Sequence, residues 1–175
     1  LLTGKNNFLV NTCKDLPKIK YVITLDSDTK LVLNTAEKLV GAMAHVLNHP
    51  EINKISNTVS RGHALIQPRI GVHILDERRN IFTRLFAGEG GTDLYTNAIS
   101  DVYQDNFDEG IYTGKGIYDL EVFNEVLKDA IPENTVLSHD LLEGSFLRCG
   151  LASDIVLMDG YPSNYLAYKV RKHRW

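Results

Sequence analysis

Two aspartates separated by one serine follow a run of β-favouring residues in the stretch YVITLDSDTKL, residues 21–31. In a turn just beyond a strand, the carboxylates of Asp26 and Asp28 can converge on one cation. Mg²⁺ and Mn²⁺ prefer oxygen ligands and keep positions open for phosphate oxygens. The pattern therefore predicts a metal ion that neutralises a diphosphate leaving group. The alternative is an ordinary solvated strand end.

The same stretch also resembles the nucleophile strand of haloacid-dehalogenase-type, magnesium-dependent phosphatases. Those proteins usually place one residue between the second aspartate and the threonine, whereas Asp28 and Thr29 are adjacent here. The chain also lacks a later Gly-Asp pair with the acidic spacing that such phosphatases use for magnesium. A phosphatase is therefore the second enzyme hypothesis.

A lysine stands between two glycines in TGKGIYD, residues 113–119. The flanking Gly114 and Gly116 allow backbone N–H groups and the Lys115 ammonium to come close to an anion. A tight turn that leads into a helix explains the same residues. Lys115 is thus a candidate for binding the phosphates of a nucleotide.

An aspartate opens an amphipathic segment in LSHDLLEG, residues 137–144. The helix dipole favours a carboxylate at this place, so Asp140 can act as the N-cap of a helix. An ionised aspartate at the mouth of a cleft can also accept the proton of an attacking hydroxyl. Asp140 is the candidate general base, ahead of His139 and Glu143.

The sequence ends with an arginine and a tryptophan, Arg174 and Trp175. A guanidinium binds phosphate oxygens well, and a large flat ring can pack against a sugar. The pair is therefore a candidate for binding the pyrophosphate and the sugar of a substrate. A charged helix end is the alternative.

The elements that must position these residues follow from the hydrophobic pattern. Short β-rich runs alternate with longer segments of helical period, which predicts an α/β domain with a mostly parallel sheet. The first strand is expected at 21–25. A helix is expected from a capping box of Asn34 and Glu37 to near Asn48, and Pro68 indicates extended chain near a sheet edge. The other expected elements are a glycine-rich turn at 105–119, a helix at 120–131, a helix starting at 138–140 and a strand at 154–158.

Composition limits the classes of function. The chain of 175 residues is 43% hydrophobic, enough to bury the core of one domain spanning 1–175. Its net charge is −3 and it has no long basic run, which argues against nucleic acid as a partner. Its two cysteines have no metal-ligand spacing, so free thiols are expected. No apolar stretch approaches the roughly 20 residues that span a bilayer.

The ordered set of segments resembles the catalytic glycosyltransferase domain of cyclic β-1,2-glucan synthases, which is related to processive inverting family-2 type enzymes such as cellulose synthase. The resemblance runs along nearly the whole chain, through GKNN, YVITLDSDT, GAMAHVLNHP, LIQPRI, SDVYQDNFDEGIYTGKGIYD, PENTVLSHDLLEG and KHRW. It implies a GT-A-like nucleotide-diphospho-sugar fold, UDP-glucose as donor, Mg²⁺ or Mn²⁺, and a β-glucan acceptor and product. It also implies a larger multidomain parent at the cytoplasmic face of the inner membrane.

The resemblance assigns roles to particular residues. Asp26 and Asp28 match the Asp-x-Asp that meets the metal and the UDP diphosphate, and Asp140 matches the acidic residue that serves as base. Arg174 and Trp175 match the end of the Gln-x-x-Arg-Trp signature. The chain departs from that signature at its first position, where Arg171 stands in place of the glutamine.

The residues before position 21 are too few for a βαβ unit, which takes roughly 30 residues or more. We therefore expect the chain to lack the N-terminal βαβ part of such a fold. On this interpretation the isolated chain binds UDP-glucose weakly and makes no glucan, and an uncovered apolar face favours self-association. A non-catalytic, glycan-binding or structural module is the hypothesis from a different class.

Overall fold

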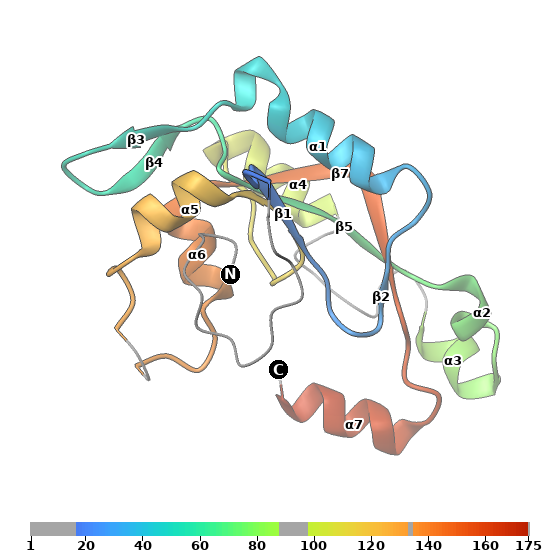
Figure 1. Ribbon diagram of the computed structural model, residues 1–175. Coiled ribbons are helices and arrows are strands. Elements are labelled where there is room, and N and C mark those ends of the chain that lie inside the picture. Colours follow the sequence, from blue (N-terminus) through green and yellow to red (C-terminus); the bar gives the residue numbers. More distant parts are fainter. Residues whose placement is uncertain (1–16, 88–97, 133–134, 175) are drawn as a thin grey trace.

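The computed structural model describes residues 17–87, 98–132 and 135–174. A five-stranded sheet lies at the centre, with helices on both of its faces (Figure 1). The prediction of a mixed α/β fold is confirmed. Within the described ranges, no helix is long and apolar enough to cross a membrane.

The direction of the strands differs from the expectation of a mostly parallel sheet, which is wrong. Only β5 and β7 are parallel, whereas the pairs β1–β6, β6–β5 and β7–β2 are antiparallel. The strands β2 and β6 lie in segments that were expected to be turns. Both are too short for their hydrophobic pattern to show the alternation of a strand. In spatial order the strands are β1 (Tyr21–Thr24), β6 (Gly116–Asp119), β5 (Leu65–Val72), β7 (Cys149–Asp159) and β2 (Thr29–Lys30).

Pro68 lies in β5, the middle strand of the sheet, but beyond the end of the β5–β6 ladder, so within the described residues one side of β5 is locally an edge at this position. Proline lacks the N–H that a ladder requires, so it normally stays at edges or bulges. Here β6 pairs with β5 only at Leu65 and Ile66, before the proline is reached. On the other side, the register with β7 shifts between Pro68 and Arg69. The bulge and the short neighbour together accommodate the proline in the centre of the sheet.

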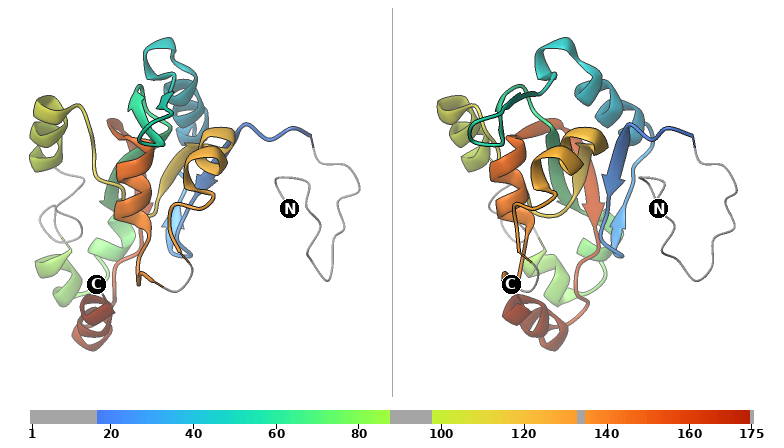
Figure 2. Two further views of the ribbon diagram at one scale, coloured as in Figure 1. Left: turned by 90° about the vertical axis from the view of Figure 1, so that its left-hand side faces the viewer. Right: turned by 60° about the vertical axis from the view of Figure 1, so that its left-hand side comes forward.

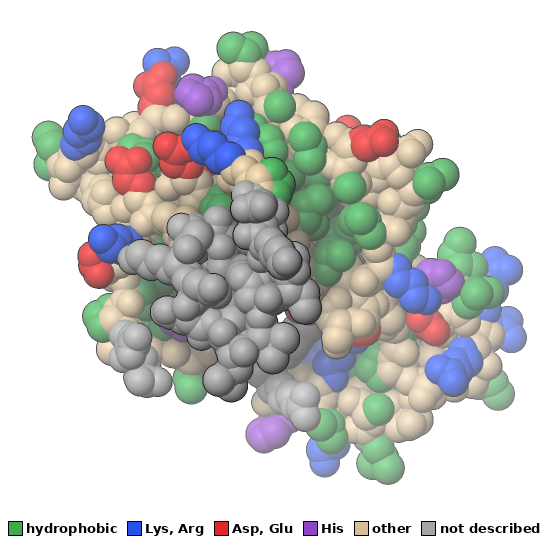
Figure 3. Space-filling model, in the orientation of Figure 1, with side chains coloured by type: hydrophobic (Ala, Val, Ile, Leu, Met, Phe, Trp, Pro, Cys, Tyr) green, Lys and Arg blue, Asp and Glu red, His purple; other side chains and the backbone are tan. Residues whose placement is uncertain are grey.

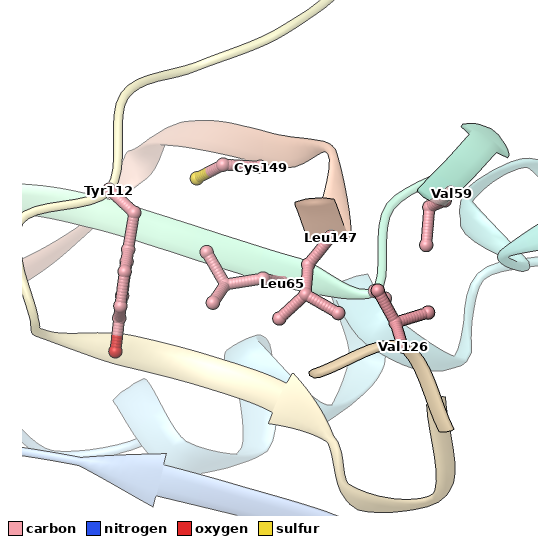
Figure 4. Close-up of a cluster of buried hydrophobic side chains, with 7 residues drawn as sticks. Val59, Leu65, Tyr112, Val126, Leu147 and Cys149 are labelled. Carbon is pink, nitrogen blue, oxygen red and sulfur yellow. The ribbon is translucent and has the colours of Figure 1, made fainter. Parts of the chain in front are cut away.

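The core has two layers because successive side chains of a strand point to opposite faces. Ile66 faces α1 (Thr35–Ala44), where it packs with Leu39 and Met43, which lie one helical turn apart. Leu65 faces the other layer, made by α5 (Leu120–Leu127) and α6 (Asp140–Leu147). Figure 4 shows this second cluster, whose labelled members are Val59, Leu65, Tyr112, Val126, Leu147 and Cys149.

The helix α1 begins differently from the expectation. Asn34 is its N-cap, but the backbone there is left-handed and no side-chain hydrogen bond caps the helix. The predicted capping box with Glu37 is therefore wrong. The helix ends at Ala44, and a separate 3₁₀ turn at Val46–Asn48 continues to the expected end.

The other elements surround this core, and α7 lies beyond the end of β7 (Figures 1 and 2). The short helices α2 (Ile74–Glu77) and α3 (Ile81–Phe86) expose the apolar side chains of Ile74, Leu75, Ile81 and Leu85. On the right of Figure 3, hydrophobic side chains are interspersed with Lys and Arg side chains. These elements are the hairpin β3 (Glu51–Asn53) and β4 (Thr58–Arg61), α2 (Ile74–Glu77), α3 (Ile81–Phe86), α4 (Ala98–Phe107) and α7 (Tyr165–Arg174).

Cys149 is a free, buried thiol in β7, and burial raises its pKa. It starts the strand, which is longer at its N-terminal end than the expected 154–158. Cys13 lies outside the described residues.

Candidate active site

The two aspartates of the first motif lie in the turn between β1 and β2. The backbone N–H of Thr29 donates to the carbonyl of Asp26 at 3.1 Å, which closes the turn. The carbonyl of Asp28 accepts a hydrogen bond from Gly160 N–H at 3.1 Å, so the end of β7 holds this turn. The side chains of Asp26 and Asp28 remain 51% and 45% exposed, and both carboxylates can reach a solvent-borne ligand.

Lys115 reaches this turn from the loop before β6, although its side chain is buried. Its Nζ lies 3.0 Å from Asp26 Oδ2 and 3.1 Å from Asp159 Oδ2. Burial by itself lowers the pKa of the ammonium, but the Asp159 and Asp26 carboxylates outweigh that effect and raise the pKa above its ordinary value. Lys115 is therefore protonated at neutral pH beside the carboxylate turn.

The path of the backbone around Lys115 requires a glycine on each side of it. Gly114 has φ +89°, and a Cβ added there would lie 3.1 Å from Asp140 Oδ2. A Cβ at Gly116 would lie 2.3 Å from the carbonyl oxygen of Ile66, inside the β5–β6 ladder. The glycines thus let the backbone pass between α6 and β5 and bring Lys115 to the turn. The glycines therefore do more than form a tight turn, which was the alternative explanation of this motif.

Gln67, which the sequence motifs did not single out, anchors the same loop. Its fully buried side chain accepts hydrogen bonds at Oε1 from Thr113 N–H at 3.0 Å and Thr113 Oγ1 at 3.2 Å. Nearby, the hydroxyls of Tyr112 and Thr24 are hydrogen-bonded at 2.9 Å. The loop before β6 is therefore fixed both to β5 and to the end of β1.

Asp159 is a second site residue that the motifs missed. It is the last residue of β7 and is buried. Thr29 Oγ1 donates to its Oδ1 at 2.5 Å, and its Oδ2 lies near both Lys115 and Arg171. The available signal was an aspartate directly after the DIVLM strand and before a glycine.

Arg171 comes to the site from α7. Its Nη1 lies 3.3 Å from Asp28 Oδ2 and donates to the carbonyl of Gly160 at 2.9 Å. Its Nη2 lies 3.8 Å from Asp159 Oδ2. The arginine that replaces the glutamine of the signature therefore faces the aspartate turn. Arg174 is the last residue of α7, but its side chain and Trp175 lie outside the described residues, so their roles stay predictions.

Asp140 is the first residue of α6, and His139 occupies the N-cap position without a side-chain cap bond. The alternative explanation, in which Asp140 is the N-cap, is therefore wrong, and its role as a base stays a prediction. Its half-buried carboxylate lies against Gly114 and accepts a hydrogen bond from Ser138 Oγ at 3.4 Å. One turn later, burial raises the pKa of Glu143, and the nearby Asp140 raises it further.

Asp26, Lys115, Asp159, Arg171 and Asp28 form a series of alternating carboxylates and cations, which we call the carboxylate–cation chain. In the part of the chain that the structure describes, no three His, Cys, Asp or Glu side chains are grouped to hold a metal. Mg²⁺ commonly binds through one or two carboxylates and takes its other ligands from phosphates and water. The exposed pair Asp26 and Asp28 fits that donor set, in competition with Lys115 and Arg171.

Comparison with known proteins gives one informative similarity. No family model matches the chain. The chain is 44% identical over 158 residues to a protein of Rhizobium meliloti (strain 1021) described as "Cyclic beta-(1,2)-glucan synthase NdvB". The match covers 90% of this chain but only 6% of that protein's length.

Proposed function

We propose that this chain, which is related to cyclic glucan synthases, is part of a glycosyltransferase domain that adds glucose from UDP-glucose to a growing β-glucan. We further propose β-1,2 linkage, inversion at the anomeric carbon and a fold of the GT-A kind. The chain spans a small part of its relative, so the activity of the whole protein is carried over as a proposal and not as a property of this segment.

One observation carries the proposal: the turn at Gly114–Gly116 contacts both the candidate base and the carboxylate turn. Asp140 packs against Gly114, and the next residue, Lys115, reaches Asp26. A single displacement needs a base on one side of the reacting carbon and a stabilised leaving group on the other. The two groups come from segments more than a hundred residues apart, and this turn joins them.

In the proposed reaction the acceptor hydroxyl oxygen forms a bond to the anomeric carbon while the bond from that carbon to the UDP oxygen breaks. Asp140 takes the hydroxyl proton, and the electron pair of the broken bond leaves with the diphosphate. The enzyme forms no covalent intermediate. Asp140 lies in the first turn of α6, beside Gly114.

Asp26 and Asp28 would hold the Mg²⁺ or Mn²⁺ ion, which supplies neutralisation of the diphosphate when it is bound. Lys115 supplies a fixed positive charge on the same side, because its neighbouring carboxylates keep it protonated. Arg174 and Trp175 are proposed to contact the nucleotide and the sugar. These residues divide the site into a diphosphate side and a base side.

The direct test is to incubate the chain, within its parent protein, with UDP-glucose labelled in glucose, Mn²⁺ and a β-glucan oligosaccharide. Labelled, lengthened glucan together with released UDP is the expected result. Release of phosphate from sugar phosphates without glucosyl transfer would instead support the phosphatase. Binding of the oligosaccharide without any turnover would support a non-catalytic module.

A further inference from the structure

We propose that Asp159 is a positioning residue that holds Lys115 and Arg171 at the diphosphate while Asp26 and Asp28 bind the divalent cation. This inference rests on the proposed function of the same site. It adds a role for two residues, Asp159 and Arg171, to which the sequence motifs assigned none.

The surroundings of Asp159 make it the fixed point of the carboxylate–cation chain. Its backbone lies in β7 between β5 and β2, where it pairs with Val72 and Thr29. Its carbonyl also accepts a hydrogen bond from His73 N–H at 3.1 Å. With Oδ1 bonded to Thr29 Oγ1, the buried carboxylate presents Oδ2 to the two cations.

Asp26 and Asp28 are placed differently, because they lie in a turn and are half exposed. A divalent cation that binds their oxygens competes directly with Lys115 and Arg171. A buried ammonium that loses all of its carboxylate partners is costly. Asp159 removes that difficulty, because it keeps both cations paired and in place when the exposed aspartates turn to the metal.

The consequence is that the divalent cation and the diphosphate each strengthen the binding of the other. Metal on Asp26 and Asp28 takes up the negative charge of two carboxylates that otherwise balances Lys115 and Arg171, so the two cations attract a diphosphate more strongly. By linkage, the diphosphate then tightens metal binding by the same factor. Gly160, whose carbonyl holds Arg171 Nη1 at 2.9 Å, keeps the guanidinium directed at this place.

Calorimetry of the full chain with inorganic pyrophosphate, with and without saturating Mn²⁺, tests the role of Asp159. We expect Asp159→Asn to weaken pyrophosphate binding with Mn²⁺ by about tenfold, a typical coupling between two ligands. Binding without Mn²⁺ should change much less, because Asp26 and Asp28 then still hold the cations. Asp108→Asn is the matched control, since it removes a carboxylate paired with Arg148 at the opposite end of β7.

Two further variants keep the test decisive if Asp159→Asn fails to fold, which circular dichroism would reveal. Thr29→Val removes the hydroxyl bond to Asp159 and should give a smaller loss with the same dependence on Mn²⁺. Arg171→Gln should weaken binding with Mn²⁺, and combining it with Thr29→Val should add less than the sum of both losses.

Equal losses with and without Mn²⁺ would overturn the positioning role, because they indicate a general structural effect. The positioning role would also be overturned if Asp159→Asn left the affinity for pyrophosphate unchanged, or if the unsubstituted chain did not bind pyrophosphate. The proposed transferase activity can be contradicted independently of the role of Asp159. A chain that shows the Mn²⁺-dependent loss with pyrophosphate but transfers no glucose would retain the role of Asp159 and contradict glucosyl transfer.

Discussion

Lys115 and Asp159 form a buried ion pair, with Nζ 3.1 Å from Oδ2 and side chains only 3% and 2% exposed. Removing one member of such a pair leaves the other as a buried charge with fewer partners, which typically costs about 3–5 kcal/mol. The pair therefore contributes to stability at the proposed diphosphate side of the site. It also ties the loop before β6 to the end of β7.

Lys115→Met should lower the free energy of unfolding by about 3 kcal/mol, since it leaves Asp159 without its ammonium. The raised pKa of Lys115 means that this contribution is fully present below its ordinary value of 10.5 and is lost as pH rises through the higher folded value. Urea unfolding at pH 7 measures the loss. Lys18→Met is the control, because Lys18 pairs with Glu121 at the exposed surface. Equal stability of the two variants would contradict the structural role.

In the intact parent protein, Asp28→Asn should weaken the Mn²⁺-dependent binding of UDP-glucose, because the amide lacks the charge that a hard cation needs. We expect a loss of about tenfold across a metal titration, as for the removal of partners next to a metal. Asp154→Asn, on an exposed position of β7, controls for the change in net charge. If the unsubstituted protein and Asp28→Asn bound UDP-glucose with identical affinity at every Mn²⁺ concentration, Asp28 would not be a metal ligand.

In the intact parent protein, Asp140→Asn should spare donor binding and lower glucosyl transfer by at least about 10²-fold, because the amide cannot accept the acceptor's proton. Measuring UDP-glucose affinity and turnover on the same preparation separates the two effects. Transfer near the parental rate would mean that Asp140 only supports the start of α6.

Gly114→Ala should disturb the junction between the two sides of the site. The residue has φ +89°, and the new Cβ would lie 3.1 Å from Asp140 Oδ2. We expect a destabilisation of about 1–3 kcal/mol from the left-handed backbone and a loss of transfer. Gly41→Ala in α1 is the opposite control, because a Cβ there meets nothing within 4 Å and alanine favours a helix by about 0.5–1 kcal/mol. Similar effects of both substitutions in thermal unfolding would argue against this path of the loop.

Glu143→Gln should stabilise the protein more at pH 7 than at pH 4. Burial, followed by Asp140, raises the pKa of Glu143 above its ordinary value of 4.5, so the folded chain holds this proton to a higher pH than the unfolded chain. Stability therefore falls as pH rises through that interval, and glutamine removes the effect. Urea unfolding at both pH values measures it, with the exposed Glu125→Gln as the control for net charge. A stability difference that does not depend on pH would contradict the desolvation of Glu143.

The local sequence determined several features correctly. The β-branched run before Asp26 became β1, and the periodic apolar residues after Asp119 became α5. The helix expected to start at 138–140 became α6. Each of these features depends on interactions between residues near one another in the chain, so composition and period reveal them.

Only the tertiary structure decided the strand directions and the carboxylate–cation chain. The ladder between β2 and β7 sets Thr29 opposite Asp159, residues 130 positions apart in the sequence. Arg171 meets Asp28 across 143 positions, because α7 follows the end of β7. Such contacts depend on the order in which the strands pair, and short strands carry no hydrophobic pattern that reveals this order. Asp159 and Lys115 become buried only when those strands have paired.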